Sequence, residues 1–459
     1  MATDNTILYH ESGRPQFHFT ARCNVLNAPN GLVYCAGEYH LFFQHNPMGK
    51  NWGNMTWGHA VSTDLVTWRQ LDNAIEPDQL GTIYSGSAVV DHDNTSGFQT
   101  GAEPCIVAIY TAAGGSSAES QGRPFTQCIA FSNDLGRTWT KYADNPVLPH
   151  VVGENRDPKV IWYAPGAVWV MVLFLDIGSF GLFTSPDLKH WSRVQTVALP
   201  DSSECPDIFP LTIEGSAAEE RWIITAANGH YLVGRFDGHE FSDISGPFTM
   251  DFGANFYAGQ TFSDIPSSDG RRIQIGWLAG GVYPDMPFNQ QMSFPVALSL
   301  RETSDGLRVY RYPVAEVNEL VDNVHEWSDL TLAPGDNPLS SFSSDLLDIE
   351  LDAEPGSDSI LDFRIGDTEV RYSAANRTIS CLGRSHRCEG NPGDFSIRIL
   401  VDRTSIEIFA DGGRTVMSFC VTPSSPEAAL EIYAEGSPIH IPSLQVRKLK
   451  SAWPDTIFE

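Results

Sequence analysis

A short pattern repeated three times in the first half of the chain constrains its fold more than any other feature. It consists of Ser-x-Asp-Leu, two or three further residues and a Trp, and its copies begin at Ser62, Ser132 and Ser185. Each copy follows an apolar run, so its Asp can bond its own backbone in a turn and its Trp can pack between sheets. The starts lie 70 and 53 residues apart, and four-stranded propeller blades repeat on about that scale. The repeat therefore favours a β-propeller, with unrelated hairpin turns as the alternative.

The composition favours β-structure along the whole chain. The 459 residues include 39 Gly, 29 Pro, 11 Trp, 14 Tyr and 25 Phe, as expected for many short strands joined by tight turns. Beyond Arg301, a stretch rich in Pro, Ser and Asp precedes strands of period-two alternation such as LLDIELDAE and TSIEIFAD, which indicates antiparallel sheets packed face to face. We therefore expect an all-β fold with a five-bladed β-propeller over residues 10–305, a connecting segment over 306–340 and a C-terminal β-sandwich over 341–450.

The net charge and the hydropathy exclude several classes of partner. There are 29 Lys and Arg against 57 Asp and Glu, a formal charge of −28, which repels phosphate backbones and anionic lipids, so we expect no nucleic-acid and no membrane partner. No stretch approaches the roughly 20 apolar residues of a spanning helix. The start of the chain, MATDNTILYHESGRPQ, lacks the features of a secretory leader. It fits a cytoplasmic protein or a secreted one whose leader has been removed, and we favour the extracellular location. The sequence does not indicate the oligomeric state.

The cysteines and histidines indicate neither a disulfide framework nor a metal site. Eight cysteines in a chain of this length are too sparse for a disulfide scaffold, and no CxxC pair occurs. Cys381 and Cys388 could close a hairpin, but we expect most cysteines to be buried thiols. The 13 His lack the spacing of metal ligands. We therefore expect no metal and no cofactor.

Four polar clusters occur where the propeller pattern predicts inner strands or their ends. They are NAPNG at 27–31, FFQHNP at 42–47 with WGN at 52–54, NRDP at 155–158, and SECPD at 203–207. A propeller collects such groups from several blades around its central channel, which is its natural concave site. Taken singly, each cluster is better explained as a turn than as a catalytic site.

Taken together, the clusters resemble the motifs of glycoside hydrolase family 32, the fructosidases that include invertases, exo-inulinases and levanases. The family's motifs Trp-Met/Leu-Asn-Asp-Pro-Asn-Gly, Phe-Ser-Gly-Ser, Arg-Asp-Pro and Glu-Cys are similar to VLNAPNG at 25–31, YSGS at 84–87, RDP at 156–158 and EC at 204–205. The resemblance runs from about Arg14 to about Trp453 and includes a sandwich strand pair, ILVDRTSIEIFADGG.

This resemblance implies a retaining glycoside hydrolase that releases fructose from terminal β-D-fructofuranosyl units of fructans such as inulin or levan, and of sucrose. Retention needs two carboxyl groups about 5 to 5.5 Å apart, one to attack the anomeric carbon and one to protonate the leaving oxygen. By the family pattern, Glu204 is the acid/base and Asp157 stabilises the transition state. The residues that the resemblance places around the substrate are Asn27, Gln44, Trp52, Ser85, Arg156, Tyr257 and Trp277.

Position 28 departs from the family pattern. The family's nucleophile there is Asp, whereas this chain has Ala28, and a methyl group cannot form a glycosyl-enzyme ester. We therefore predict that hydrolysis is nearly absent. Either an Asp was deliberately replaced so that uncleaved substrate stays bound, or the chain is a natural pseudoenzyme that binds fructans without turnover. The first explanation is favoured because five other motif residues are intact: Asn27, Pro29, Asn30, Asp157 and Glu204. Linkage preference, exo or endo action, and transfer to an acceptor sugar stay open.

Overall fold

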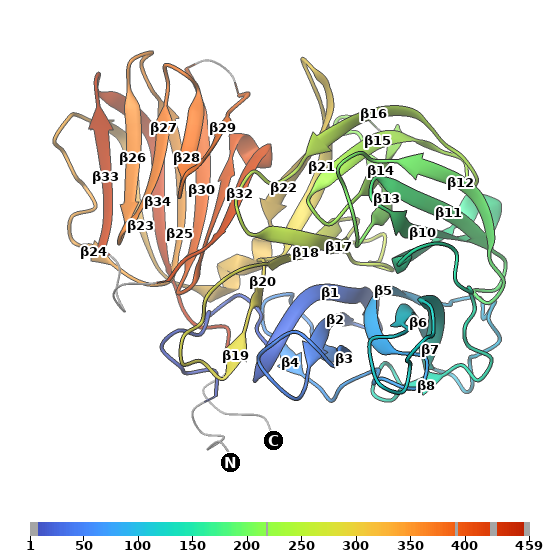
Figure 1. Ribbon diagram of the computed structural model, residues 1–459. Coiled ribbons are helices and arrows are strands. Elements are labelled where there is room, and N and C mark those ends of the chain that lie inside the picture. Colours follow the sequence, from blue (N-terminus) through green and yellow to red (C-terminus); the bar gives the residue numbers. More distant parts are fainter. Residues whose placement is uncertain (1–7, 217–218, 391–392, 423–428, 454–459) are drawn as a thin grey trace.

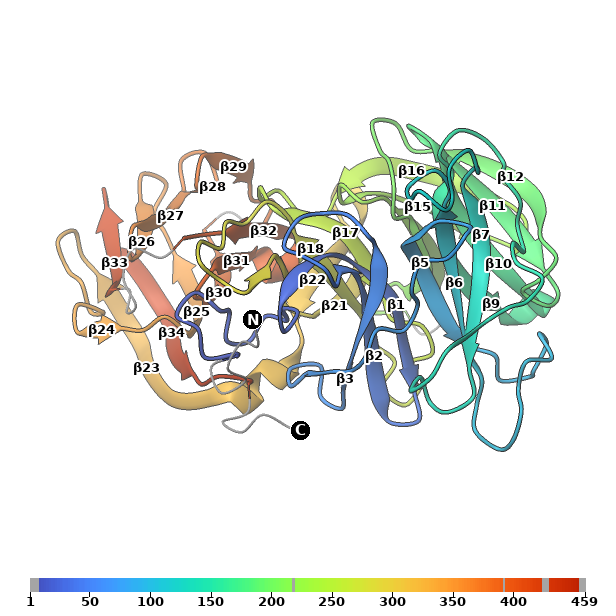
Figure 2. The same cartoon turned by 60° about the horizontal axis from the view of Figure 1, so that its bottom comes forward.

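The computed structural model describes residues 8–216, 219–390, 393–422 and 429–453, which form seven sheets (Figure 1). Five sheets of four or five strands lie within residues 24–313, and two six-stranded sheets follow. Figures 1 and 2 both show the second group beside the first, as a sandwich beside a propeller. The expected all-β fold, a propeller followed by a sandwich, is confirmed.

The first three blades come from consecutive stretches of chain, apart from one late strand. Blade one, in the order β19-β1-β2-β3-β4, consists of β1 (Asn24–Cys35), β2 (Glu38–Asn46), β3 (Thr56–Ser62), β4 (Arg69–Gln70) and β19 (Phe288–Asn289). Blade two consists of β5 (Thr82–Val90), β6 (Ile106–Ala113), β7 (Thr126–Ser132) and β8 (Thr140–Lys141). Blade three consists of β9 (Arg156–Tyr163), β10 (Val168–Asp176), β11 (Ser179–Ser185) and β12 (Ser192–Ala198), with the short 3-10 helix η1 (Ala164–Gly166) between β9 and β10.

Two further blades complete the ring. Blade four consists of β13 (Asp207–Thr212), β14 (Glu220–Thr225), β15 (His230–Phe236) and β16 (Phe241–Thr249). Blade five consists of β17 (Phe256–Thr261), β18 (Arg272–Leu278), β20 (Gln291–Met292), β21 (Val296–Thr303) and β22 (Gly306–Pro313). The inner strands β1, β5, β9, β13 and β17 each contact the next, and β17 contacts β1. The parallel pairing of β19 with β1 further ties the end of the propeller to its start.

The repeated turn occupies the same place in three blades. It joins the third strand to the fourth, between β3 and β4, β7 and β8, and β11 and β12. In each copy the Asp carboxylate accepts backbone N–H bonds from its own turn. The Leu after the Asp has a positive φ in each copy: Leu65 (67°), Leu135 (57°) and Leu188 (64°). The repeat is therefore a structural repeat of the blades, and the alternative of unrelated hairpins is wrong.

The sandwich consists of two sheets of six strands each. One, in the order β23-β34-β25-β30-β31-β32, contains β23 (Val321–Leu332), β25 (Leu347–Glu354), β30 (Phe395–Asp402), β31 (Ser405–Ala410), β32 (Thr415–Cys420) and β34 (Ile439–Leu449). The other, in the order β24-β33-β26-β27-β28-β29, contains β24 (Phe342–Ser343), β26 (Ile360–Ile365), β27 (Thr368–Ser373), β28 (Thr378–Cys381), β29 (Arg384–Arg387) and β33 (Ala429–Glu435). The other 3-10 helices are η2 (Ala315–Leu320) and η3 (Asp411–Gly413).

The stretch 306–340, expected as a connection, is largely structured. It contains β22, η2 and β23, of which β22 belongs to blade five and β23 to a sandwich sheet. All eight cysteines lie in the described residues and are free thiols, so Cys381 and Cys388 are not bridged. Across the described ranges, none of the helices is both long and apolar enough to cross a membrane.

A buried ionic cluster fastens the segment before β1 to the sandwich. His18 lies between Asp402 and Glu407, with Nδ1 and Nε2 at 2.9 and 2.7 Å from their carboxylate oxygens, and all three side chains are buried. The carboxylate of Asp402 also accepts the backbone N–H groups of Gln16, Phe17 and His18. Burial, the largest single influence, lowers the pKa of His18, but the bonds with both carboxylates outweigh it and raise that pKa to about 9. Charged His18 thus ties the segment before β1 to two carboxylates of the sandwich.

Candidate active site

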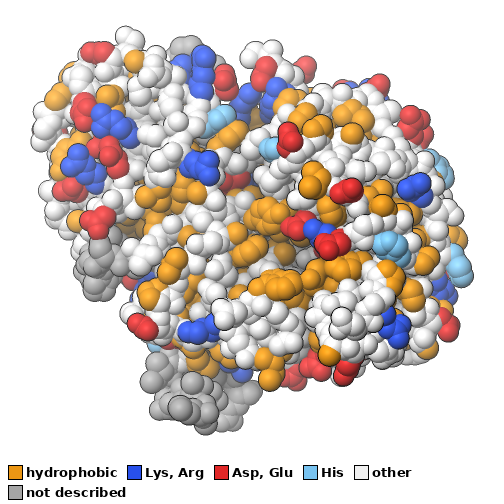
Figure 3. Space-filling model, viewed as in Figure 1, with side chains coloured by type: hydrophobic (Ala, Val, Ile, Leu, Met, Phe, Trp, Pro, Cys, Tyr) orange, Lys and Arg blue, Asp and Glu red, His pale blue; other side chains and the backbone are white. Residues whose placement is uncertain are grey.

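One pocket collects side chains from blades one, two, three and five and from the segment that leads into β13 of blade four. It is lined by Asn27, Ala28, Gln44, Trp52, Tyr84, Ser85, Arg156, Asp157, Glu204, Cys205, Tyr257, Ala258 and Trp277. All ten residues expected from the sequence are in this set, although they span 251 positions of the chain, from 27 to 277. In the space-filling view, acidic and basic side chains lie together among hydrophobic ones near the middle of the propeller (Figure 3).

Three of the lining residues were not among those expected. Tyr84, Cys205 and Ala258 each lie next to an expected residue in the chain. Tyr84 stands where the family motif has Phe, and Cys205 belongs to the Glu-Cys motif, so the motifs themselves contained the signal for both. Tyr84 packs edge-on against the exposed Trp52, with ring centroids 5.9 Å apart, and forms part of an aromatic rim.

β-Bulges in the inner strands present these residues to the pocket. In the pairing of β1 with β2, the register passes from Leu26↔His45 to Pro29↔Phe43, so two residues, Asn27 and Ala28, lie opposite one, Gln44. The inner strands of three other blades have the same kind of shift, at Tyr84 and Ser85, at Asp157 and Pro158, and at Ala258 and Gly259. A bulge bends its strand and redirects side chains, which is why bulges concentrate at functional sites.

The backbone of the pocket is strained at four of its lining residues. Asp157, Glu204, Cys205 and Ala258 have φ values of 65°, 57°, 38° and 52°, in the left-handed region that residues with a Cβ seldom occupy. Such conformations persist only where the surroundings hold them, and they cluster at functional sites.

Two buried side chains behind the pocket hold Asp157 in place. Its backbone N–H donates to the hydroxyl of Thr111 at 2.9 Å, and that hydroxyl donates to Oε1 of Gln127 at 2.7 Å. The amide of Gln127 in turn donates to the carbonyl of Asn155 at 3.3 Å. Thr111 and Gln127 are fully buried. Sequence reasoning missed both, because they lie on second and third strands of a blade and belong to no motif.

The carboxylate of Asp157 is buried beside a cation. It accepts the backbone N–H of Cys205 at 3.0 Å, and Nε of Arg156 lies 3.8 Å away. Burial raises the pKa of Asp157 to about 6, although Arg156 and the Cys205 N–H act in the opposite direction. This carboxyl group therefore changes its charge near pH 6.

Glu204 is held by two donors and faces the pocket opening. Nη2 of Arg156 donates to its Oε1 at 2.7 Å, and the hydroxyl of Tyr257 donates to its Oε2 at 2.8 Å. The Glu204 side chain is 34% exposed, against 6% for Asp157. Burial and the negative charge of Glu204 raise the pKa of Tyr257, so its hydroxyl remains a donor. Arg156 thus bridges two carboxylates of very different exposure.

Ala28 forms an apolar part of the wall. Its side chain packs with Ala227 and Ala258, and its N–H donates to Oδ1 of Asn27 at 2.7 Å. Across the bulge, Nε2 of the 4% exposed Gln44 has no hydrogen-bond partner among the described residues.

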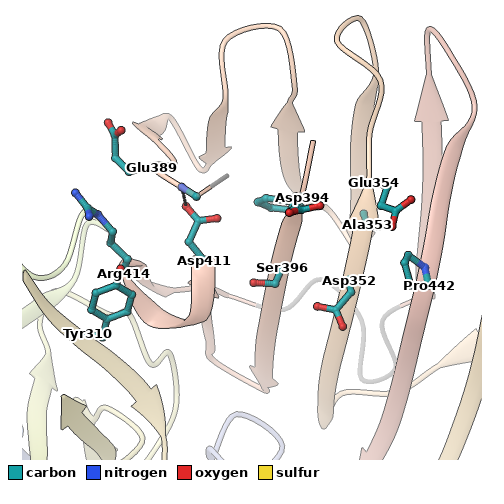
Figure 4. Close-up of a pocket in the computed structure, with 12 residues that line it drawn as sticks. Tyr310, Asp352, Ala353, Glu354, Glu389, Asp394, Ser396, Asp411, Arg414 and Pro442 are labelled. Carbon is teal, nitrogen blue, oxygen red and sulfur yellow. Dashed lines mark hydrogen bonds between the residues drawn. The ribbon is translucent and has the colours of Figure 1, made fainter. Parts of the chain in front are cut away.

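A larger cavity of about 420 Å³ lies elsewhere, between β22 and the sandwich (Figure 4). Five of its twelve lining residues are Asp or Glu, and Arg414 is a cation in its wall. Its most buried acid, Asp411, already accepts the N–H of Gly390 at 3.1 Å. None of the residues expected from the sequence lies there.

Sequence comparison identifies the family. The profile of the glycosyl hydrolases family 32 N-terminal domain matches residues 18–313, and that of the glycosyl hydrolases family 32 C terminal matches residues 316–448. The chain belongs to glycoside hydrolase family 32. This family 32 chain is 39% identical over 497 residues to a levanase of Bacillus subtilis. The alignment covers 98% of this chain and 72% of the levanase. It is 32% identical to a levanase of Bacillus sp. strain L7 and spans 53% of that protein's length.

Solved structures of similar fold cover nearly all of the family 32 chain. The fructofuranosidase of Schwanniomyces occidentalis complexed with fructose superposes with a TM-score of 0.87 at 26% identity, covering 98% of this chain and 100% of that one. The exo-inulinase of Aspergillus awamori gives a TM-score of 0.86 at 26% identity, covering 97% and 100%. Within the described residues of this chain, no group of three or more His, Cys, Asp or Glu is placed to hold a metal ion.

Proposed function

We propose that this family 32 chain has the site of a retaining β-fructofuranosidase, which holds the terminal β-D-fructofuranosyl unit of levan, inulin or sucrose. The observation that carries the proposal is the meeting of Ala28, Asp157 and Glu204 in one pocket, with Arg156 between the two carboxylates. The substrate class is supported by the relatives, which are a levanase, an exo-inulinase and a fructofuranosidase.

The two carboxylates differ in a way that suits two roles. Glu204, exposed to the pocket and oriented by Arg156 and Tyr257, gives a proton to the leaving oxygen. Asp157, buried and fixed by the Cys205 N–H, accepts hydrogen bonds from fructosyl hydroxyls, and such charge-assisted bonds strengthen as positive charge develops at the anomeric carbon. The remaining polar contacts to the sugar come from Asn27, Gln44 and Ser85, and the aromatic faces from Trp52 and Trp277.

Ala28 occupies the nucleophile position in this proposal. Without a carboxylate there, no glycosyl-enzyme ester forms, so the chain binds fructosides and turns them over extremely slowly. Removing a nucleophile costs on the order of 10⁶ in kcat in a well-studied protease. The same alanine favours the second candidate, a fructan-binding protein without turnover.

The decisive experiment restores the carboxylate. Ala28→Asp is assayed for fructose release from levan, inulin and sucrose, beside Ala28→Asn, which has the same shape without a nucleophile. Hydrolysis by the Asp variant alone supports the proposal, and its loss in Ala28→Asp/Glu204→Gln supports the role of Glu204. Calorimetric binding of fructans without hydrolysis in the folded Asp variant would favour the binding protein. Neither binding nor hydrolysis would overturn both candidates.

A further inference from the structure

Two opposite charges lie buried on the inner strands, just beyond the two pocket carboxylates. Lys159 of β9 follows Asp157 by two residues, and Asp207, the first residue of β13, follows Glu204 by three. Their side chains are 1% and 0% exposed, Nζ lies 3.5 Å from Oδ1, and neither residue lines the pocket. A buried ion pair often stabilises a fold no better than apolar side chains of similar volume do. Stability alone therefore gives little reason for these charges to be here.

Both charged groups bind the backbone of one residue in blade five. Nζ of Lys159 donates to the carbonyl of Thr261 at 2.5 Å, and Oδ2 of Asp207 accepts the Thr261 N–H at 2.6 Å. Thr261 is the last residue of β17, the strand that carries Tyr257, whose hydroxyl donates to Glu204. The ion pair thus joins the inner strands of blades three, four and five at a single point.

No strand ladder sets the distance between these inner strands. In the part of the chain that the structure describes, β9, β13 and β17 belong to three different sheets. The distance between Asp157 and Glu204 therefore depends on groups that reach from one blade to the next. In the pocket, these links are the bond from Arg156 to Glu204 and the bond from the Cys205 N–H to Asp157. Both use the carboxylates that a bound sugar would also contact, whereas the buried ion pair lies outside the pocket.

Blade two fixes the backbone on either side of Lys159. The hydroxyl of the fully buried Ser87 donates to the carbonyl of Pro158 at 3.0 Å and accepts the N–H of Val160 at 2.9 Å. β9 is therefore anchored to blade two by Ser87, while the side chain of Lys159 connects it to blades four and five.

We propose that Lys159 and Asp207 are positioning residues, whose ion pair holds β9 and β13 at the separation that Asp157 and Glu204 need. The proposal rests on the proposed function, because it takes these two carboxylates as the groups that bind and protonate a fructoside. A displacement of about 1 Å at a reacting group can lower a rate about 100-fold. The pair therefore acts on the reaction without touching the substrate.

The test uses the Ala28→Asp variant, in which turnover can be measured. Lys159→Met, made in that variant, removes the charge from a side chain of similar length, and Asp207→Asn keeps an acceptor for the Thr261 N–H. Each single change leaves one buried charge without its partner, which is strongly destabilising, so both should lower the urea denaturation midpoint. We expect kcat on sucrose to fall about 100-fold while KM changes little, because the loss concerns the transition state more than sugar binding.

The double variant Lys159→Met/Asp207→Asn separates positioning from stability. It contains neither buried charge, so its denaturation midpoint should recover toward that of Ala28→Asp, while kcat should stay about 100-fold low. Arg398→Met is a matched control, because it breaks a buried ion pair of the sandwich in which Nε of Arg398 lies 2.8 Å from Oδ1 of Asp348. This control should lower the midpoint and leave kcat unchanged.

The outcomes separate this proposal from the proposed function. Low kcat in the double variant beside a recovered midpoint supports positioning, whereas joint recovery of kcat and midpoint would show a purely structural pair and overturn the proposal. An equal fall of kcat in Arg398→Met would trace the loss to destabilisation and overturn it too. If Ala28→Asp hydrolyses sucrose and the folded single variants keep its kcat, positioning is overturned and the proposed function stands. A folded but inactive Ala28→Asp variant would overturn both.

Discussion

Replacing Thr111 by valine should destabilise the propeller and disturb the pocket, although Thr111 does not line it. The change removes a hydroxyl while keeping the shape of the side chain. It leaves two buried groups without partners, the backbone N–H of Asp157 and Oε1 of Gln127. An orphaned buried polar group costs about 1–3 kcal/mol, so the free energy of unfolding should fall by about 2–6 kcal/mol. Thr111→Ser keeps the hydroxyl and loses a methyl group, which should cost about 1 kcal/mol.

Urea denaturation followed by tryptophan fluorescence compares the two variants directly. Fructose affinity, measured by calorimetry, should also fall in Thr111→Val and recover in Thr111→Ser, because Asp157 depends on this hydroxyl to hold its φ of 65°. A valine variant as stable as the serine variant, with unchanged affinity, would refute the reasoning that Thr111 positions Asp157.

Two further predictions concern pH. The pKa of Asp157 in the empty pocket is about 6, and a fructosyl ligand bonds to the ionised form of this carboxyl group. Affinity for the ligand should therefore fall as the pH drops through about 6, and Asp157→Asn should remove this pH dependence. A flat calorimetric affinity profile from pH 5 to 8 would contradict the prediction. The pKa of His18 is raised to about 9, so its contribution to stability is complete below about 6.5, the ordinary histidine value, and is lost as the pH rises through about 9. Denaturation midpoints should therefore decline between pH 7 and 10 in the original chain, and less steeply in His18→Gln.

Much of the fold could be read from the sequence because its signals are local. The Ser-x-Asp-Leu turn forms within a few residues, through bonds from the Asp carboxylate to nearby backbone N–H groups, so it marks each blade wherever it occurs. Alternation of apolar and polar residues with period two likewise depends only on which face of its own strand each side chain occupies. The domain boundaries 10–305, 306–340 and 341–450 remain predictions. β22 lies within the expected connecting segment but pairs with β21 of blade five.

The sequence by itself determined the all-β architecture and, through motifs in their order, the ten residues expected in the pocket, among them the alanine at position 28. Only the tertiary structure decided how those residues act on one another. It brought Arg156 between Asp157 and Glu204, set Gln44 across a bulge from Ala28, and placed Thr111 behind Asp157. These relations depend on strand register and on the closing of the blades around the axis. A single bulge, which inserts one residue into a ladder, changes which side chain faces the pocket, and no local pattern specifies it.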